Sequence, residues 1–294
     1  MKLAAIDIGS NAARLLISDV TENENTPPVF TKLNLIRVPL RLGFDVFEKG
    51  EISRQRILML IQTMKAFSFL MKAYEVKHVK ACATSAMRDA ANSAEIIRRV
   101  KLETGIKINI ITGDEEASIV YENHVAEKLD KQHAYLYIDV GGGSTELSFF
   151  ADDKLLYKES INIGTIRLLK NMVDENSWMQ MRSKIKTNIK SKIPVIAIGS
   201  GGNINKVFSL SKRKDSKPLA LQLLKDYYKE LSSFALEDRI RLYKMKDDRA
   251  DVIVPALQIY INVMRWADIE EIYVPKIGLA DGLVQSLYKD LNTK

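Results

Sequence analysis

Apolar and polar positions along this chain follow two different periods, which is the pattern of an α/β protein. Residues 53–74 carry apolar side chains at spacings of three and four, which predicts a long amphipathic helix. Residues 92–103 predict a second helix, which Gly105 ends. Short apolar runs typical of buried strands occupy 76–84 and 106–112, and residues 195–203 predict a buried strand that enters a glycine-rich turn. Alternating strands and helices predict a sheet covered by helices.

The sequence also repeats itself. Residues 3–18 read LAAIDIGSNAARLLIS and residues 135–150 read YLYIDVGGGSTELSFF, so Asp7 and Asp139 occupy equivalent positions. Each copy contains an apolar strand, a turn of small polar residues and a second apolar strand, which predicts a β-hairpin. Solenoid repeats recur every ~20–50 residues. The spacing here is about one domain and therefore predicts two related domains.

The chain length agrees with two domains. At 294 residues, it exceeds the usual size of one domain, roughly 100–200 residues. We expect domains over 1–125 and 126–279, with the C-terminal helix, 280–294, packed back on the first. There is no run of 18 apolar residues, so no transmembrane helix is predicted. The single cysteine, Cys82, excludes an internal disulfide and favours a reducing cytoplasm.

The net charge of +7 is compatible with an anionic partner. Two lysine-rich stretches, 184–192 and 212–214, are interpreted as solvated faces. Neither is interleaved with aromatic residues as in a platform that stacks bases, so no nucleic-acid partner is predicted.

Three glycine-rich turns follow apolar strands, at 7–11, 139–144 and 199–203. One such cluster is usually just a tight turn. Three of them favour a phosphate site, because backbone N–H groups at such turns hold phosphate oxygens. Asp7 and Asp139 are costly to bury unless paired or bound to a cation such as Mg²⁺. Glu146 lies across the second hairpin, as a partner of Asp139 or as an exposed strand carboxylate.

Five segments in this order, IDIGSNAARLLI, ATSAMRDAAN, IITGDEEA, YIDVGGGSTEL and AIGSGGN, resemble the exopolyphosphatase / guanosine pentaphosphate phosphohydrolase family. The resemblance extends from Leu3 to about Leu287. It implies the short form of that family, in the actin–hexokinase superfamily. The implied fold has two actin-like (ribonuclease H-like) α/β domains with an interdomain cleft.

The resemblance also implies residue roles. Glu116 would be the general base that activates water, and Arg88 would add positive charge. Asp139 and Glu146 would hold Mg²⁺ or another divalent cation. Phosphate would be bound by Asp7, Gly9, Ser10, Asn11, Arg14, Gly141, Gly142, Gly143, Ser144, Thr145, Gly199, Gly201 and Gly202. Alternatives are that Glu115 and Glu116 only compensate a helix dipole, and that Arg88 is a surface arginine paired with Asp89.

The implied activity is hydrolysis of the terminal phosphoanhydride bonds of inorganic polyphosphate, and guanosine pentaphosphate is an alternative substrate. Two alternatives belong to other functional classes. One is a phosphotransferase, and the other is a non-catalytic protein that binds polyphosphate or guanosine tetra- or pentaphosphate. The sequence departs from the family at Ala12, Asn203 and Ala280, so the non-catalytic alternative stays open. A cytoplasmic homodimer without membrane partners is expected by analogy.

Overall fold

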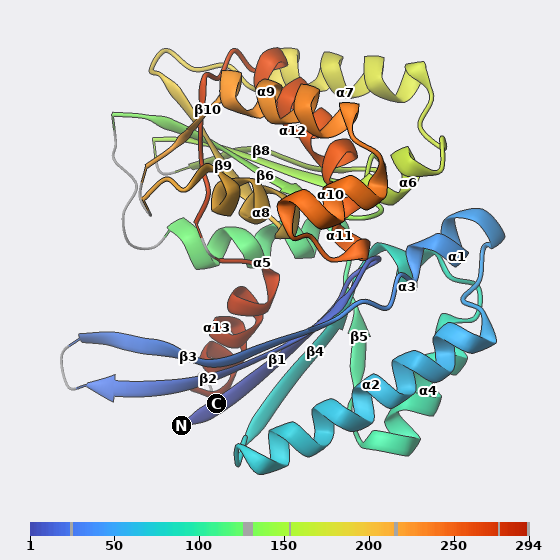
Figure 1. The fold of residues 1–294 in the computed structure, drawn as a ribbon. Helices are drawn as coiled ribbons and strands as arrows, with labels where there is room; N and C mark the ends of the chain where they lie inside the picture. Colours follow the sequence, from blue (N-terminus) through green and yellow to red (C-terminus); the bar gives the residue numbers. More distant parts are fainter. Residues whose placement is uncertain (24–25, 126–131, 153, 215–216, 276, 293–294) are drawn as a thin grey trace. The chain divides into compact units, whose positions relative to one another are not determined.

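The computed structural model describes residues 1–23, 26–125, 132–152, 154–214, 217–275 and 277–292. The chain divides into two compact units (Figure 1). Unit 1 comprises Met1–Asn123 and Gly278–Lys294, and unit 2 comprises His124–Ile277. Each unit contains one sheet with helices packed on it, which confirms the predicted α/β class. The boundary expected at 125–126 stays a prediction, because residues 126–131 lie outside the described ones.

The sheet of unit 1 has the order β3-β2-β1-β4-β5. Its strands are β1 (Lys2–Ile8), β2 (Ala13–Asn23), β3 (Thr26–Val38), β4 (His78–Ala83) and β5 (Ile108–Ile110). Its helices are α1 (Gly43–Lys49), α2 (Arg54–Ala73), α3 (Ser85–Asp89), α4 (Ser93–Thr104), α5 (Gly113–Val125) and α13 (Leu279–Asn292). The predicted helices over 53–74 and 92–103 are α2 and α4.

Both faces of β1 are buried. Leu3 and Ala5 on one face pack with Leu283 of α13, and the alternate residues Ala4 and Ile6 are equally inaccessible. Helices α2 and α4 lie on the other side of the strands from α13 (Figure 1). A strand covered on both faces has a continuous run of apolar residues. Asp7, near the end of β1, is the polar exception to this run.

The sheet of unit 2 has the order β10-β11-β9-β6-β7-β8. Its strands are β6 (Ala134–Val140), β7 (Thr145–Ala151), β8 (Lys154–Ile161), β9 (Val195–Ser200), β10 (Leu219–Ala220) and β11 (Glu271–Tyr273). Its helices are α6 (Thr165–Leu169), α7 (Glu175–Asn188), α8 (Gly202–Ser211), α9 (Leu221–Ser233), α10 (Leu236–Tyr243), α11 (Asp247–Ala250) and α12 (Ile253–Trp266). Leu136, Ile138 and Phe149 form its core with one face of α12.

Each copy of the sequence repeat folds as the predicted antiparallel hairpin, β1–β2 in unit 1 and β6–β7 in unit 2. The same hydrogen bond closes both turns. Gly9 N–H donates to the Ala12 carbonyl at 3.0 Å, and Gly141 N–H donates to the Ser144 carbonyl at 2.9 Å. The two turns are therefore alike in backbone hydrogen bonding as well as in sequence.

Across the part of the chain that the structure describes, no helix combines the length and the apolar character needed to cross a bilayer.

Candidate active site

The two hairpins place different charges at equivalent positions. In unit 1, Asp7 lies opposite Arg14, and Arg14 Nη1 donates to Asp7 Oδ2 at 2.6 Å. In unit 2, Asp139 lies opposite Glu146. Paired residues of neighbouring strands project on the same face of a sheet, so Asp139 and Glu146 are neighbours there. Unit 1 thus holds a carboxylate with its counter-ion, and unit 2 holds two adjacent carboxylates.

Glu146 is fixed in place by two hydroxyl groups. Its side chain is buried, and its Oε1 accepts hydrogen bonds from Ser144 Oγ at 2.6 Å and from Ser160 Oγ at 2.8 Å. These two hydrogen bonds hold the carboxylate in one orientation. Sequence reasoning missed Ser160, which stands opposite Glu146 on β8, a strand without any motif.

A divalent cation fits the Asp139–Glu146 pair chemically. Two neighbouring carboxylates repel one another, and a bound cation would offset that repulsion. Among the described residues, no group of three or more histidine, cysteine, aspartate or glutamate side chains could hold a metal. A metal at this pair would have two carboxylate ligands, one from β6 and one from β7. Mg²⁺ at phosphate sites is typically held by one or two carboxylates together with substrate oxygens and water.

The glycine turn before Glu146 is tied down through its carbonyl groups. Thr165 N–H donates to Gly141 O at 3.0 Å and Ile166 N–H donates to Gly142 O at 2.8 Å, both from α6. Arg167 Nε donates to Gly143 O at 2.8 Å. Carbonyls fixed in this way hold the turn rigidly at the end of the β6–β7 hairpin. Such a preformed turn can present N–H groups to an anion.

Gly164 allows α6 to approach this turn. A Cβ atom at position 164 would lie 2.5 Å from the Gly142 carbonyl oxygen, which is closer than any real contact. Thr145 Oγ1 also donates to Ile163 O at 2.6 Å, next to this glycine. Gly164 could not be predicted from the sequence, because its role depends on a turn more than twenty residues away.

The third glycine turn lies directly beside Asp139. Gly201 has φ +108°, and a Cβ atom there would lie 3.1 Å from Asp139 Oδ1. Gly201 also caps the N-terminus of α8, where unpaired N–H groups favour anions. Gly199 has a packing role, since a Cβ atom there would collide with Ile272 at 2.7 Å.

Arg249, which sequence reasoning missed, covers Gly202. A Cβ atom on Gly202 would lie 2.4 Å from Arg249 Nη1, and the same Nη1 donates to Asn203 Oδ1 at 2.8 Å. Asn203 therefore provides an acceptor for the arginine. The pKa of Lys206 is lowered by burial and then by the positive charge of Arg249. Positive charge thus gathers at the start of α8.

Tyr260 and Ser200 complete the surroundings of Asp139. The Tyr260 hydroxyl donates to the Ser200 carbonyl. Burial, and then the charges of Asp139 and Glu146, raise the Tyr260 pKa well above its usual value, so it stays neutral. Ser200 pairs with Asp139 across the sheet. Its Oγ is buried and has no hydrogen-bond partner among the residues that the structure describes.

In unit 1, the turn after β1 is anchored on several sides. Ser10 Oγ and Ser85 Oγ lie 2.7 Å apart and are both buried, which joins the turn to α3. Gly43 N–H donates to Ser10 O and Arg41 N–H donates to Asn11 O, both at 2.9 Å. The backbone of the turn is thus held in one conformation.

The two adjacent glutamates of α5 have different environments. Thr112 N–H donates to Glu115 Oε2 at 2.7 Å, and Glu115 N–H donates to Thr112 Oγ1 at 3.1 Å. This reciprocal pair is a capping box. Glu115 is exposed, whereas Glu116 is half-buried. Glu115 therefore serves the start of the helix, as the helix-dipole alternative expects, and Glu116 is left for another role.

The Cys82 thiol is affected by the charges of these acids and of Asp7. Burial is the main cause that raises the pKa of the Cys82 thiol to about 11, and the charges of Asp7, Glu115 and Glu116 add to it. Cys82 pairs with Asp7 across the sheet. The negative charges of β1 and of the start of α5 therefore surround one strand position.

Arg88 is tied to the strand end that leads into α5. Its Nη1 donates to the Ile111 carbonyl at 2.9 Å, and its side chain is half-buried. The motif ATSAMRDAAN thereby contacts the motif IITGDEEA within unit 1. Of the departures from the family pattern, Ala12 and Ala280 are both buried, and the Ala12 carbonyl closes the first turn.

Comparison with known structures identifies the class of protein as a two-domain actin-like α/β protein. An exopolyphosphatase from Cytophaga hutchinsonii matches with a TM-score of 0.84 at 25% identity, over 100% of this chain and 98% of that one. A Ppx/GppA family member from Aquifex aeolicus matches with a TM-score of 0.75 at 25% identity, over 99% and 98%.

The chain belongs to the Ppx/GppA phosphatase family, whose model matches residues 17–291. Exopolyphosphatase 1 of Mycobacterium tuberculosis is 24% identical over 97% of this chain and 87% of its own length. A bifunctional 3-dehydroquinate synthase/phosphatase of Fusobacterium nucleatum is 30% identical over 85% of this chain, which spans 41% of that protein. Membership confirms the predicted family and its enzyme class, the phosphoanhydride hydrolases.

Proposed function

We propose that this chain is an exopolyphosphatase that hydrolyses the terminal phosphoanhydride bonds of inorganic polyphosphate. The observation that carries the proposal is the pairing of Asp139 with Glu146 at the tied-down turn Gly141–Ser144. Two carboxylates beside a phosphate-type turn suit a substrate that arrives with a divalent cation. Exopolyphosphatases among the relatives support the same substrate.

Asp139 and Glu146 would hold the cation, Mg²⁺ in the simplest case. When bound, the cation would neutralise charge on the phosphoryl group being transferred. Ser144 and Ser160 orient Glu146 for that role. The start of α8 and the N–H groups of Gly142 and Gly143 would bind phosphate oxygens in unit 2.

Glu116 would act as the general base that takes a proton from the attacking water. Phosphoanhydride hydrolysis needs positioning and charge stabilisation more than covalent chemistry. A half-buried carboxylate at the start of a helix, next to one already used for capping, suits proton transfer. In unit 1, Arg14 and Arg88 would supply positive charge, and the turn at Ser10 and Asn11 would bind further phosphate oxygens.

The test is a phosphate-release assay on the purified chain with polyphosphate and, in parallel, with guanosine pentaphosphate, each with and without Mg²⁺. We expect Mg²⁺-dependent release of orthophosphate with a higher kcat/KM for polyphosphate. A higher kcat/KM for guanosine pentaphosphate would show that this nucleotide is the preferred substrate, and the proposed hydrolysis reaction would stand. Formation of ATP from polyphosphate and ADP in place of phosphate release would contradict the hydrolase proposal.

A further inference from the structure

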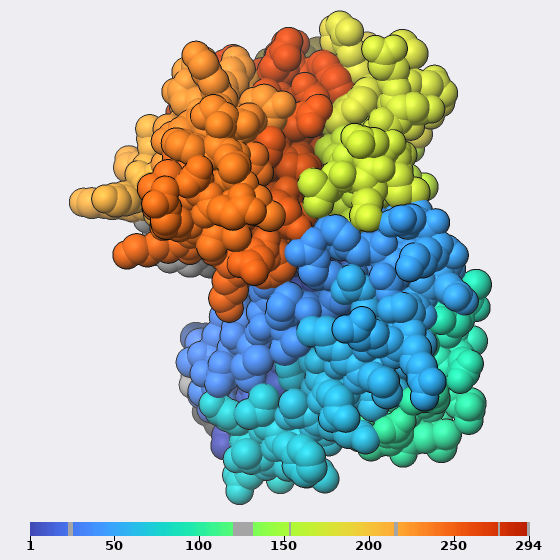
Figure 2. Space-filling view, turned by 45° about the vertical axis from the view of Figure 1, so that its right-hand side comes forward, coloured from blue at the N-terminus to red at the C-terminus, as the bar shows by residue number. Residues whose placement is uncertain are grey.

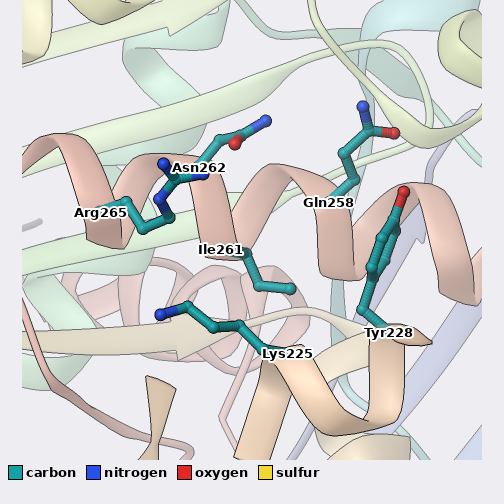
Figure 3. Close-up of a pocket in the computed structure, with 6 residues that line it drawn as sticks. All are labelled: Lys225, Tyr228, Gln258, Ile261, Asn262 and Arg265. Carbon is teal, nitrogen blue, oxygen red and sulfur yellow. The ribbon is translucent and has the colours of Figure 1, made fainter. Parts of the chain in front are cut away.

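A polar groove lies between α9 and α12 of unit 2, and none of its residues belongs to the candidate active site. Its volume is about 470 Å³, within the usual range for small-molecule sites of roughly 300–1,000 Å³. It is lined by Lys225 and Tyr228 of α9 and by Gln258, Ile261, Asn262 and Arg265 of α12 (Figure 3). The outer face of α12 lies at the surface between orange and yellow-green segments (Figure 2).

The groove follows from the two-sided character of α12. Residues 258, 261, 262 and 265 recur at spacings of three and four, so they share one face of the helix. Leu257, Tyr260 and Met264 belong to the buried core, and Ile261, which is also buried, lies at the border between the core and the groove. Lys225 and Tyr228 are three residues apart on α9 and face the same groove.

The polar side chains of this groove have unused hydrogen-bonding capacity. None of the five has a side-chain hydrogen bond or ion pair with another residue that the structure describes. Gln258 and Asn262 each offer both a donor and an acceptor, and Lys225 and Arg265 offer charged donors. A set of convergent polar groups over an apolar floor, Ile261, is typical of a ligand site.

The two ends of the groove differ in chemistry. Lys225 and Arg265 lie at one end with Asn262, and Tyr228 and Gln258 lie at the other (Figure 3). The described residues that line the groove include no acidic one. The cationic end suits a phosphate group, and the end with an aromatic ring and an amide suits a flat, hydrogen-bonding ring.

We propose that this groove binds a nucleoside phosphate, with the phosphate between Lys225 and Arg265 and the base between Tyr228 and Gln258. Inorganic polyphosphate fits it less well. Its chain consists of acceptor oxygens, which can use neither the amide oxygens of Gln258 and Asn262 nor the tyrosine ring. The site is therefore distinct in ligand class from the proposed polyphosphate site.

The test is a fluorescence titration of the full chain with ADP carrying an N-methylanthraniloyl group on the ribose. We expect saturable binding at one site per chain. In the double variant Lys225→Gln/Arg265→Gln, the Kd should rise at least about tenfold, because two charge-assisted contacts are lost. Lys229→Gln is the matched control, since Lys229 is an exposed lysine of α9 outside the groove, and its Kd should equal that of the wild type.

Two further measurements locate the ligand. Tyr228→Leu should weaken ADP binding while leaving competition by pyrophosphate unchanged. Arg14→Gln, a change at the candidate active site, should leave ADP binding intact. Unchanged melting temperatures would show that each variant is folded.

The proposal fails if no saturable binding occurs at millimolar nucleotide, or if the double variant binds as the wild type does. Loss of binding in Arg14→Gln would place the nucleotide in the active site and would also overturn it. Normal ADP binding by the Tyr228→Leu variant would contradict the placement of the base between Tyr228 and Gln258.

Discussion

Arg14 and Glu146 occupy equivalent positions in the two hairpins but carry opposite charges, and this difference gives the two hairpins different chemistry. Arg14 neutralises Asp7 at 2.6 Å in unit 1. Glu146 leaves Asp139 with a second carboxylate in unit 2. From a duplicated hairpin, one copy thus becomes suited to phosphate oxygens and the other to a cation.

Replacing Glu116 with glutamine should abolish most phosphate release from polyphosphate. Loss of a general base typically costs about 10²–10⁴-fold in rate. Glu115→Gln is a matched control on the adjacent residue, because glutamine can still accept the capping hydrogen bond. Its kcat should stay within a few-fold of the wild type. Equal losses in both variants would point to the helix end as a whole rather than to Glu116.

Asp139→Asn should weaken binding of a divalent cation, measured as Mn²⁺ affinity by electron paramagnetic resonance without substrate. Changes around metal sites typically cost about 10–100-fold in affinity, and removal of a ligand charge should reach at least that. Glu159→Gln serves as control, since Glu159 is in unit 2 but forms an ion pair with Lys184. Mn²⁺ affinity unaltered by Asp139→Asn would remove Asp139 from the cation site.

Cys82 should make the protein less stable at high pH. Its pKa in the folded chain is about 11, above the ordinary value of 9.0. The folded state therefore holds the thiol proton more tightly than the unfolded state does, which adds to the free energy of unfolding. This stabilising contribution is complete below pH 9 and is lost as the pH rises from 9 to 11. The stability of the wild type relative to Cys82→Ala, measured by urea unfolding, should fall over that range. A constant difference would contradict the assigned pKa.

At the scale of the element, the contact between α6 and the turn Gly141–Ser144 makes a sharp prediction. Gly164→Ala would place a methyl group 2.5 Å from the Gly142 carbonyl oxygen. We expect the free energy of unfolding to fall by about 1–3 kcal/mol, the usual cost of overpacking, together with a lower kcat. Gly278→Ala has open space around its Cβ position and should leave the unfolding free energy nearly unchanged. Chemical denaturation of both variants provides the comparison.

The sequence predicted best those elements whose signals are local. The helix over 53–74 is observed as Arg54–Ala73, capped by Ser53, and Gly105 ends α4 with φ +75°. The strand expected over 106–112 is only Ile108–Ile110, because the capping box at Thr112 already begins α5. The edge strands β3 and β8 carried no clear signal, since their half-exposed residues lack a regular apolar alternation.

The residues of the candidate site also divide into those with a local sequence signal and those without one. The hairpins, their glycine turns and the pair Asp139–Glu146 followed from the repeat itself. Ser160, Gly164 and Arg249 were not predicted as site residues, because each acts through a residue distant in sequence. The separate duties of Glu115 and Glu116 required the hydrogen bonds of Thr112.

At the scale of the whole molecule, the proposed hydrolysis requires Arg14 and Asp139 to act on the same terminal phosphate. Arg14 in unit 1 would contact phosphate oxygens, and Asp139 in unit 2 would hold the cation bound to them. Residues that share a partner in this way have non-additive effects, whereas independent sites add within about 0.3–0.5 kcal/mol.

The most direct test is a double-mutant cycle on kcat/KM for phosphate release from polyphosphate, with Arg14→Gln, Asp139→Asn and both together. We predict that each single change lowers kcat/KM strongly and that the double variant is barely worse than the poorer single one, as for residues acting as a unit. Strictly additive losses, or a single variant with wild-type kcat/KM, would contradict a shared site.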